Sequence, residues 1–181
     1  MLPAWATEDV HLENYHQEWP LDAGRLTQEL TAVLEPWLIR RIEHIGSTSI
    51  PGMVAKPIID LMAMVEDHTV VAPQVADKLR VLGWEHVPPE LDTRPWRAFF
   101  VKVSTDKRHR LAHLHPVSKD AERWPDQILF RNTLRADSGL CEEYARLKQA
   151  LAKRYSDDRE KYTAEKAAFI RGVLAGASKR R

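Results

Sequence analysis

The chain has 181 residues and a formal net charge of +1, from 27 lysines and arginines against 26 aspartates and glutamates. This length suits one domain over residues 1–181, and the near-neutral charge gives no general attraction to nucleic acid or to a membrane surface. The one cysteine, Cys141, excludes an intramolecular disulfide and indicates a reducing compartment. The first residues lack the basic region and apolar core of a secretory signal, and no run of ~20 apolar residues follows, so we expect a cytoplasmic protein.

The first third of the chain predicts a lead-in, one helix and two strands. Residues 1–20 are expected to be extended, and apolar residues at helical spacing predict a helix over residues 22–35. A strand over residues 38–45 then delivers the chain to Gly46. The near-continuous apolar run over residues 58–65 is typical of a central strand that is covered on both faces.

The middle of the chain predicts a helix followed by a hairpin. A helix is expected over residues 71–82 and a short strand over residues 84–87. The proline-flanked segment 88–95 is expected to be a loop. Strands over residues 98–103 and 110–117 are separated by a polar turn, so they predict an antiparallel hairpin.

The last third predicts helices over residues 121–136, 139–155 and 158–175, followed by a disordered tail at residues 179–181. Strand runs alternate with amphipathic helices before this helical part. The pattern therefore indicates an α+β fold, with a mixed sheet flanked by helices and a helical C-terminal third.

A turn of small residues followed by a buried acid organises the predicted site. Gly46 permits a backbone conformation that a side chain would block. Ser47, Thr48 and Ser49 offer hydroxyl groups and an N-cap, and the free N–H groups of a helix that starts there would attract phosphate. Asp60 stands among apolar residues, where an unpaired carboxylate is costly, so it must lie at a strand edge, pair with a cation or bind a metal.

Two segments of this stretch resemble the signature of the GrpB family. They are His-Ile-Gly-Ser-Thr-Ser-Ile-Pro-Gly at residues 44–52 and Lys-Pro-Ile-Ile-Asp at residues 56–60, within a resemblance that runs from about Tyr15 to about Ile170. The resemblance implies a fold like that of the nucleotidyltransferase superfamily. Some members of the family are fused to dephospho-CoA kinase, which implies a partner of that kind.

The chain departs from the nucleotidyltransferase pattern at one acid. In that superfamily a Gly-Ser turn precedes a strand bearing Asp-x-Asp, whose carboxylates share one strand face and can hold magnesium together. This chain keeps Gly46, Ser47 and Asp60 but has Met62 at the second acidic position. A thioether is a poor magnesium ligand, so the departure counts against two-metal nucleotidyl transfer and leaves enzymatic activity open. One carboxylate can still help to hold a single metal, or it can pair with a basic residue.

Three histidines supply the second part of the predicted site. His109, His113 and His115 stand at odd positions of one strand pattern and could share a face. If that strand lies beside the strand of Asp60, then Asp60, His113 and His115 are candidate catalytic residues and ligands of a divalent metal (magnesium, manganese or zinc). Imidazole suits zinc or manganese better than magnesium. Alternatively, the histidines hydrogen-bond to Asp60 and the hydroxyl groups, or line an anion pocket.

Lysine and arginine residues supply the third part. Lys56 and Arg110 adjoin the two motifs and are predicted phosphate ligands together with the Gly46–Ser49 turn. The other arginines of this region are expected to be mostly solvent-facing, namely Arg97, Arg108, Arg131 and Arg135. The family resemblance also includes Tyr144, Lys148, Tyr162 and Lys166.

Two functions are consistent with these residues. The first is a nucleotidyltransferase-like pocket for a nucleotide or another phosphorylated small molecule, with metal-assisted nucleotidyl transfer as its enzymatic form. The alternative is a non-catalytic ligand-binding or helper module that is linked to coenzyme A biosynthesis through dephospho-CoA kinase. The missing second acid favours the helper module, whereas the compact set of Gly-Ser turn, aspartate and histidines favours a working site.

Overall fold

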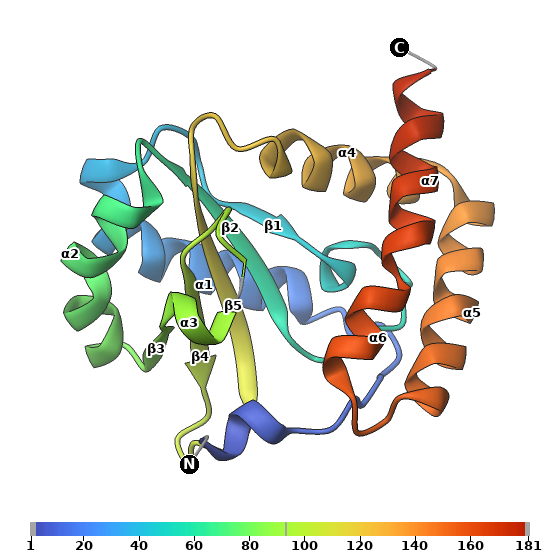
Figure 1. Cartoon of the computed structure of the whole chain (residues 1–181), viewed down its shortest axis with the longest axis horizontal. Coiled ribbons are helices and arrows are strands. Elements are labelled where there is room, and N and C mark those ends of the chain that lie inside the picture. Colours follow the sequence, from blue (N-terminus) through green and yellow to red (C-terminus); the bar gives the residue numbers. More distant parts are fainter. Residues whose placement is uncertain (1–2, 93, 180–181) are drawn as a thin grey trace.

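The structure is a computed structural model that describes residues 3–92 and 94–179. Its strands are β1 (Glu43–Ile45), β2 (Ile59–Val65), β3 (Trp84–Val87), β4 (Phe99–Val103) and β5 (Arg110–Ser118). In this described part they form one sheet in the order β1-β2-β5-β4-β3 (Figure 1). β2 and β5 pair in parallel and the other neighbours are antiparallel, so the predicted mixed sheet and the predicted β4–β5 hairpin are confirmed.

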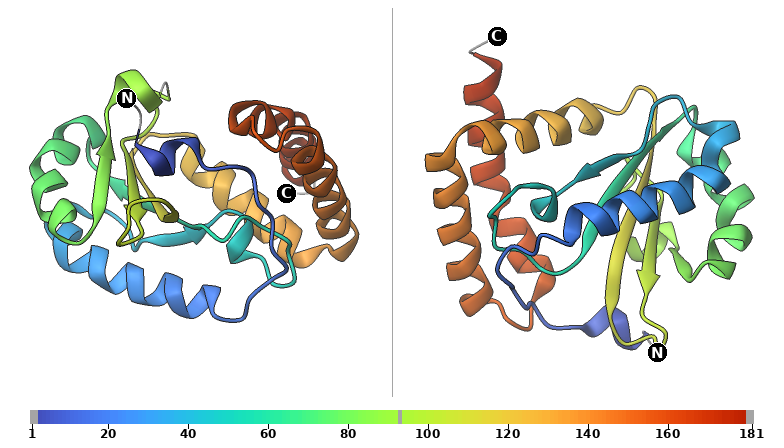
Figure 2. Two further views of the ribbon diagram at one scale, coloured as in Figure 1. Left: turned by 90° about the horizontal axis from the view of Figure 1, so that it is seen from below. Right: turned by 180° about the vertical axis from the view of Figure 1, so that it is seen from behind.

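Helices flank this sheet and make up the C-terminal part, as predicted. They are α1 (Trp19–Leu34), α2 (His68–Val81), α3 (Pro89–Asp92), α4 (Arg123–Ala136), α5 (Ser138–Arg154), α6 (Arg159–Glu165) and α7 (Ala167–Ser178), with short 3-10 helices η1 (Ala4–Thr7), η2 (Glu35–Trp37) and η3 (Ser47–Ser49). Figure 2 shows α1 and α2 on one side of the sheet, while the N-terminal segment with η1 runs over the other side. Among the described residues, no helix is long and apolar enough to cross a membrane.

The central strand β2 is buried on both faces. Ile59 and Leu61 point into the main core, which they share with apolar residues of α1 and α2. Met62 and Met64 point to the opposite face and pack in a second cluster with Trp124 of α4. This double burial explains the continuous apolar run of the strand. Asp60 stands at the start of the second face, before that apolar cluster begins.

The predicted strand over residues 38–45 is mostly wrong. The chain forms η2 after α1, Leu38 makes an isolated bridge to Val65, and regular pairing starts only at Glu43. Residues 39–41 are exposed to solvent, so the chain turns outward before it can join the sheet.

Other boundaries also differ from the prediction. The first helix begins at Trp19 rather than at residue 22, because Pro20 is tolerated in a first turn, where the missing N–H has no partner anyway. The expected loop over residues 88–95 contains the short helix α3, and the last predicted helix is divided at Lys166 into α6 and α7. Residues 180–181 of the expected tail lie outside the described residues.

Candidate functional site

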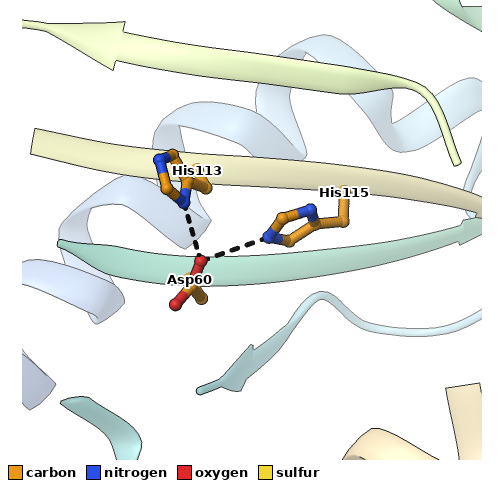
Figure 3. Close-up of side chains that lie close together, drawn as sticks. All are labelled: Asp60, His113 and His115. Atoms are coloured by element: carbon orange, nitrogen blue, oxygen red, sulfur yellow. Dashed lines mark hydrogen bonds and ion pairs between the residues drawn. The ribbon is translucent and has the colours of Figure 1, made fainter. Parts of the chain in front are cut away.

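The parallel pairing of β2 with β5 builds the centre of the site. Its register places His113 beside Asp60 and His115 beside Met62, so these side chains share the face opposite the α1 and α2 helices. His113 Nδ1 lies 3.0 Å and His115 Nε2 lies 3.2 Å from the same oxygen, Asp60 Oδ1 (Figure 3). The structure therefore brings together the aspartate and two of the three histidines that the sequence singled out.

The third histidine is not part of this cluster. His109 precedes β5, its side chain is exposed, and its Nδ1 lies 3.1 Å from Glu8 Oε1. The expectation that it shares a face with His113 and His115 is wrong, because the chain is still in the turn that joins β4 to β5 when it reaches residue 109.

The charges of the cluster follow from its burial and hydrogen bonds. Burial alone raises the pKa of Asp60, but the hydrogen bonds from His113 and His115 outweigh it and hold this pKa well below its usual range. Burial lowers the pKa of His113 to about 3 and also lowers that of His115, while Asp60 opposes both shifts. At neutral pH the cluster is thus one carboxylate with two neutral imidazoles.

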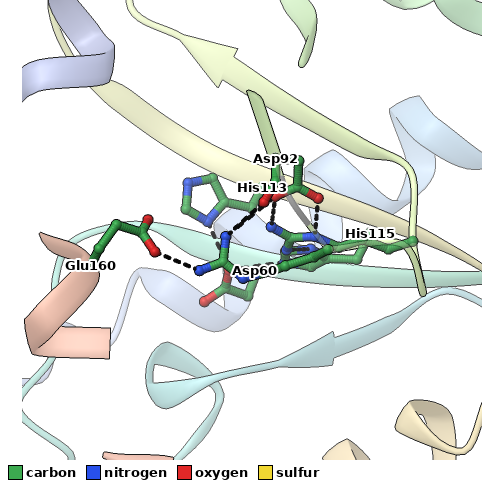
Figure 4. A network of polar contacts seen from close by, with 7 residues as sticks. Asp60, Asp92, His113, His115 and Glu160 are labelled. Carbon is green, nitrogen blue, oxygen red and sulfur yellow. Dashed lines mark hydrogen bonds and ion pairs between the residues drawn. The ribbon is translucent and has the colours of Figure 1, made fainter. Parts of the chain in front are cut away.

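Arg97 extends the cluster beyond His115. Its Nε and Nη2 atoms donate to the two carboxylate oxygens of Asp92 at 2.9 and 2.6 Å, and its Nη1 donates to His115 Nδ1 (Figure 4). The side chains of Arg97 and Asp92 are only 8% and 4% exposed, so the expectation of a solvent-facing arginine is wrong here. Arginine has no acceptor atom, so His115 Nδ1 must accept, and the ring proton of His115 lies on Nε2 and is donated to Asp60.

The serine and threonine hydroxyls are mostly engaged within the protein. Ser47 Oγ accepts from Lys148 Nζ at 3.0 Å, and Thr48 Oγ1 lies 3.0 Å from His44 Nε2. Ser49 Oγ donates to the carbonyl of Gly46 at 2.6 Å.

The expected helix start at this turn does not form. Only the three-residue η3 is present, with Gly46 as its N-cap and no capping side chain. So short a helix has little dipole with which to bind an anion, because the macrodipole is a sum over aligned peptide units. The turn therefore offers hydroxyl groups rather than a helix N-terminus.

A cavity of about 1020 Å³ lies over the cluster. Asp60, His113 and His115 line it from the sheet, and Ser47 and Thr48 line it from the turn. Its basic lining residues are Lys56, Arg94, Arg97, Lys107, Arg108, Arg110, Arg159 and Lys166.

Two lysines of this cavity make no direct ion pair in the described part of the chain, although the carboxylate of Asp60 raises the pKa of both. Burial, followed by the nearby charges of Arg159 and Lys166, lowers the pKa of Lys56 to about 7, and burial lowers that of Lys166 to about 8. Their Nζ atoms lie 5.4 and 4.2 Å from the ring centre of Tyr162, and within the described residues neither makes an ion pair with a carboxylate.

The two arginines beside them are fixed by the N-terminal segment. Arg110 donates to the carbonyl oxygens of Trp5 and Ala6 at 2.9 and 3.1 Å, and Arg159 donates to the carbonyl of Glu8 at 3.3 Å. Lys56 and Arg110 were predicted from their place beside the motifs, and Lys166 only through the family resemblance. Arg159 had no sequence signal, because its position follows from the packing of α6.

Three basic residues of α4 and α5 hold the turn at residues 46–49 in place. Lys148 is buried and donates to Ser47 Oγ and to the carbonyl of Val54. Arg131 donates to Glu43 Oε2 and to the carbonyl of His44, both at 2.8 Å. Arg135 donates to the carbonyl of Ser49 at 2.6 and 2.9 Å. The expectation of a solvent-facing arginine is therefore wrong for the buried Arg131, whereas Arg135 is exposed as expected and also contacts the turn.

The three cluster residues are candidate metal ligands, and the hydrogen-bond directions test the fit. Asp60, His113 and His115 each offer one atom, and these atoms lie within 4.8 Å of one another. A ligating nitrogen must be free of its proton, whereas His115 Nε2 carries the proton that it donates to Asp60. In this arrangement the donor set does not fit a resident metal ion.

The comparison with known proteins decides the family. Residues 9–175 match the family described as GrpB protein. The chain belongs to the GrpB family. The glutamate-rich protein GrpB of Alkalihalophilus pseudofirmus is 30% identical over 170 residues, covering 92% of this chain and 94% of that protein. A UPF0157 protein of Pseudomonas aeruginosa is 38% identical over 167 residues, covering 88% of this chain and 64% of that protein.

Solved structures confirm the predicted fold of this GrpB-family chain. GrpB from Enterococcus faecalis matches with a TM-score of 0.81 at 29% identity, over 94% of this chain and 98% of that chain. Cid1 in complex with its short product ApU matches with a TM-score of 0.54 at 15% identity, over 78% of this chain and 43% of that chain. The second likeness concerns the fold alone and is to the poly(U) polymerase Cid1.

One relative of this GrpB-family chain carries a different name. The dephospho-CoA kinase of Mycolicibacterium paratuberculosis is 27% identical over 193 residues, covering 95% of this chain and 47% of that protein. The chain thus spans about half the length of that kinase.

Proposed function

We propose that this GrpB-family protein binds a nucleotide or another phosphorylated small molecule in the cavity above Asp60. The observation that carries the proposal is the pair of half-buried lysines, Lys56 and Lys166, that line the cavity and make no direct ion pair with a carboxylate among the described residues. Burying a charge is costly unless it is paired, and their low pKa values reflect that cost. A phosphate group would supply each lysine with a direct anionic partner.

The proposed roles divide between the wall and the floor of the cavity. Lys56, Arg110 and Lys166, with Arg159 beside them, would hold the phosphate oxygens. The hydroxyls of Ser47 and Thr48 would add hydrogen bonds, while Gly46 and Ser49 would shape the turn that carries them. The floor of Asp60, His113 and His115 would contact the remainder of the ligand.

The fold neighbours support a ligand of this kind. Structures of Cid1 contain the UTP analogue UMPNPP or Mg 3′-dATP. Metal-assisted nucleotidyl transfer through Asp60, His113 and His115 is the enzymatic form of the proposal. That form requires the hydrogen bonds of His115 to be rearranged first, because its Nε2 atom is protonated.

Thermal stability in the presence of phosphorylated compounds tests the binding proposal. We expect nucleoside triphosphates, dephospho-CoA or 4′-phosphopantetheine to raise the melting temperature, because a ligand that binds only the folded state stabilises it. Lys166→Met should remove the shift. Lys161→Met is the matched control, because Lys161 lies on α6, which ends directly before Lys166, is exposed and pairs with Asp158 at 3.4 Å. No shift with any compound, or equal shifts in both variants, would contradict the proposal.

The match to a dephospho-CoA kinase favours a second candidate, a helper module linked to coenzyme A biosynthesis. In that case dephospho-CoA or 4′-phosphopantetheine alone should stabilise the protein, and a dephospho-CoA kinase from the same organism should co-elute with it in gel filtration. Stabilisation by nucleoside triphosphates without co-elution would favour the nucleotide-binding function instead.

A further inference from the structure

We propose that Arg97 closes the Asp60–His113–His115 cluster to divalent metal ions, and that the cluster becomes a metal site only when this arginine leaves His115. The proposal concerns metal ions alone and does not depend on which phosphorylated ligand enters the cavity. It follows from the direction of the hydrogen bonds in one continuous chain, which runs from Asp92 through Arg97 and His115 to Asp60 (Figure 4).

The hydrogen-bond partners of each histidine ring decide which of its nitrogens carries the proton. The guanidinium of Arg97 can only donate, so His115 Nδ1 is an acceptor and its proton lies on Nε2. The ionised Asp60 can only accept, so His113 Nδ1 also carries a proton. Both ring atoms that face the carboxylate are therefore N–H groups, and neither has a lone pair for a metal.

A bound metal would require the proton of His115 to lie on the other ring nitrogen. To ligate through Nε2, a neutral His115 must move its proton to Nδ1, which would then point at an N–H of Arg97. Two donors would face each other, whereas a metal-ligating histidine normally donates its second N–H to a carboxylate, carbonyl or water. The positive charge of Arg97 beside the site would also repel a divalent cation.

Several contacts hold the Arg97 guanidinium beside His115. Both oxygens of Asp92 accept from it, and its guanidinium carbon lies 3.9 Å from the ring centre of Phe99 and 5.1 Å from that of Trp96. Phe99 in turn stacks on His115, with ring centres 5.4 Å apart and planes 8° apart. These contacts hold the arginine against the histidine.

The rest of the cluster is suited to metal. Two imidazoles and one carboxylate form a common set for zinc, cobalt and other transition metals. His113 sets a limit to the affinity, because its Nε2 is buried without a partner within the described residues and would have to take up the displaced proton. Removing Arg97 should therefore raise metal affinity without making it extreme.

Cobalt titration of matched variants tests the proposal. Co²⁺ added to wild-type protein should give weak binding by calorimetry and little visible absorption from ligand-field bands. Arg97→Met, which keeps an unbranched side chain over Phe99 but removes the donors, should bind one Co²⁺ per chain about tenfold more tightly or better. Adding Asp60→Asn to this variant should abolish the gain.

Arg94→Met is the matched control for charge. Arg94 also contacts Asp92, at 3.4 Å, and pairs with Glu160 at 2.9 Å, so its loss removes a nearby cation without freeing His115. Its affinity for Co²⁺ should stay within about threefold of wild type, because only the general charge effect is changed.

Three outcomes would overturn the proposal. They are wild-type protein that binds Co²⁺ as tightly as Arg97→Met, an Arg94→Met variant with an equal gain, and a folded Arg97→Met variant that gains nothing. If Arg97→Met does not fold, Arg97→Gln provides the same comparison, because a glutamine oxygen can accept from His115 Nδ1–H. Circular dichroism of each variant before titration establishes that it is folded.

Discussion

The backbone of Gly46 lies directly against the carboxylate of Asp60. A Cβ atom at residue 46 would stand 2.5 Å from Asp60 Oδ2, closer than real Cβ contacts, and the φ angle of Gly46 is +70°. Glycine is therefore required twice at this position, once by the backbone conformation and once by the contact. The turn after β1 and the acid of β2 form one unit.

Alanine substitutions separate these two requirements. Gly52 also has a positive φ, +75°, but an added Cβ would meet nothing within 4 Å. Gly52→Ala should lower the free energy of unfolding by about 1–2 kcal/mol through backbone strain alone. Gly46→Ala should cost about 1–3 kcal/mol more, because Asp60 must move away from its histidines. Urea denaturation of both variants measures the difference. Equal losses of unfolding free energy would mean that the contact with Asp60 does not contribute to stability.

Met62, at the second acidic position of the nucleotidyltransferase pattern, is a core residue of this chain. Its side chain is fully buried in a cluster with Ile45, Val117 and Trp124. Met62→Asp should therefore lower the free energy of unfolding by about 3 kcal/mol or more, because the carboxylate would enter an apolar environment. Met62→Leu, the volume-conserving control, should cost less than about 1.5 kcal/mol. A Met62→Asp protein as stable as wild type in urea would show that this position tolerates the acid.

Stability should rise with pH on the alkaline side. The folded protein holds the pKa of Lys56 and Lys148 at about 7 and that of Lys166 at about 8, against an ordinary value of 10.5. Between these limits the unfolded chain binds more protons than the folded one, so unfolding becomes less favourable as pH rises from 7 to 9.

Lys166→Met should reduce this slope, by up to about 1.4 kcal/mol per pH unit for one proton. The measurement is urea denaturation at several pH values without ligand, with Lys161→Met as the control that should keep the wild-type slope. A wild-type stability that falls between pH 7 and 9 would contradict the assigned lysine environments.

Acid should begin to destabilise the protein at pH values well above the usual pKa values of carboxylates. Burial lowers the pKa of His44 from 6.5 to about 4, and that of His113 from 6.5 to about 3. Below pH 6.5 the unfolded chain takes up protons that the folded chain refuses, so stability is lost as pH falls towards these folded values. His44→Gln, which can still bond to Thr48, should reduce the pH dependence of the free energy of unfolding by up to one proton. His109→Gln, which changes an exposed side chain, should leave this dependence unchanged. Urea denaturation between pH 4 and 7 measures it, and an identical pH profile for wild type and both variants would contradict this account.

The sequence by itself determined the local structure and the family. The apolar run around Asp60 indicated a central strand, because both faces of β2 are buried. Turn residues between two strand patterns indicated the β4–β5 hairpin, and the spacing of His113 and His115 placed them on one strand face. The segments at residues 44–52 and 56–60 carried the family resemblance, because a contiguous motif can be recognised without knowing how the rest of the chain folds.

Only the tertiary structure decided how these parts meet. The pairing that sets His113 beside Asp60 joins positions 53 residues apart, and no local periodicity encodes such a register. The packing of α6 against α5 and α7 decided that Arg159 lines the cavity, and burial decided that Arg97 donates to His115 instead of facing solvent. Periodicity reports which side of an element is buried, whereas the charge balance and proton positions of this site arise from contacts between elements that are distant in sequence.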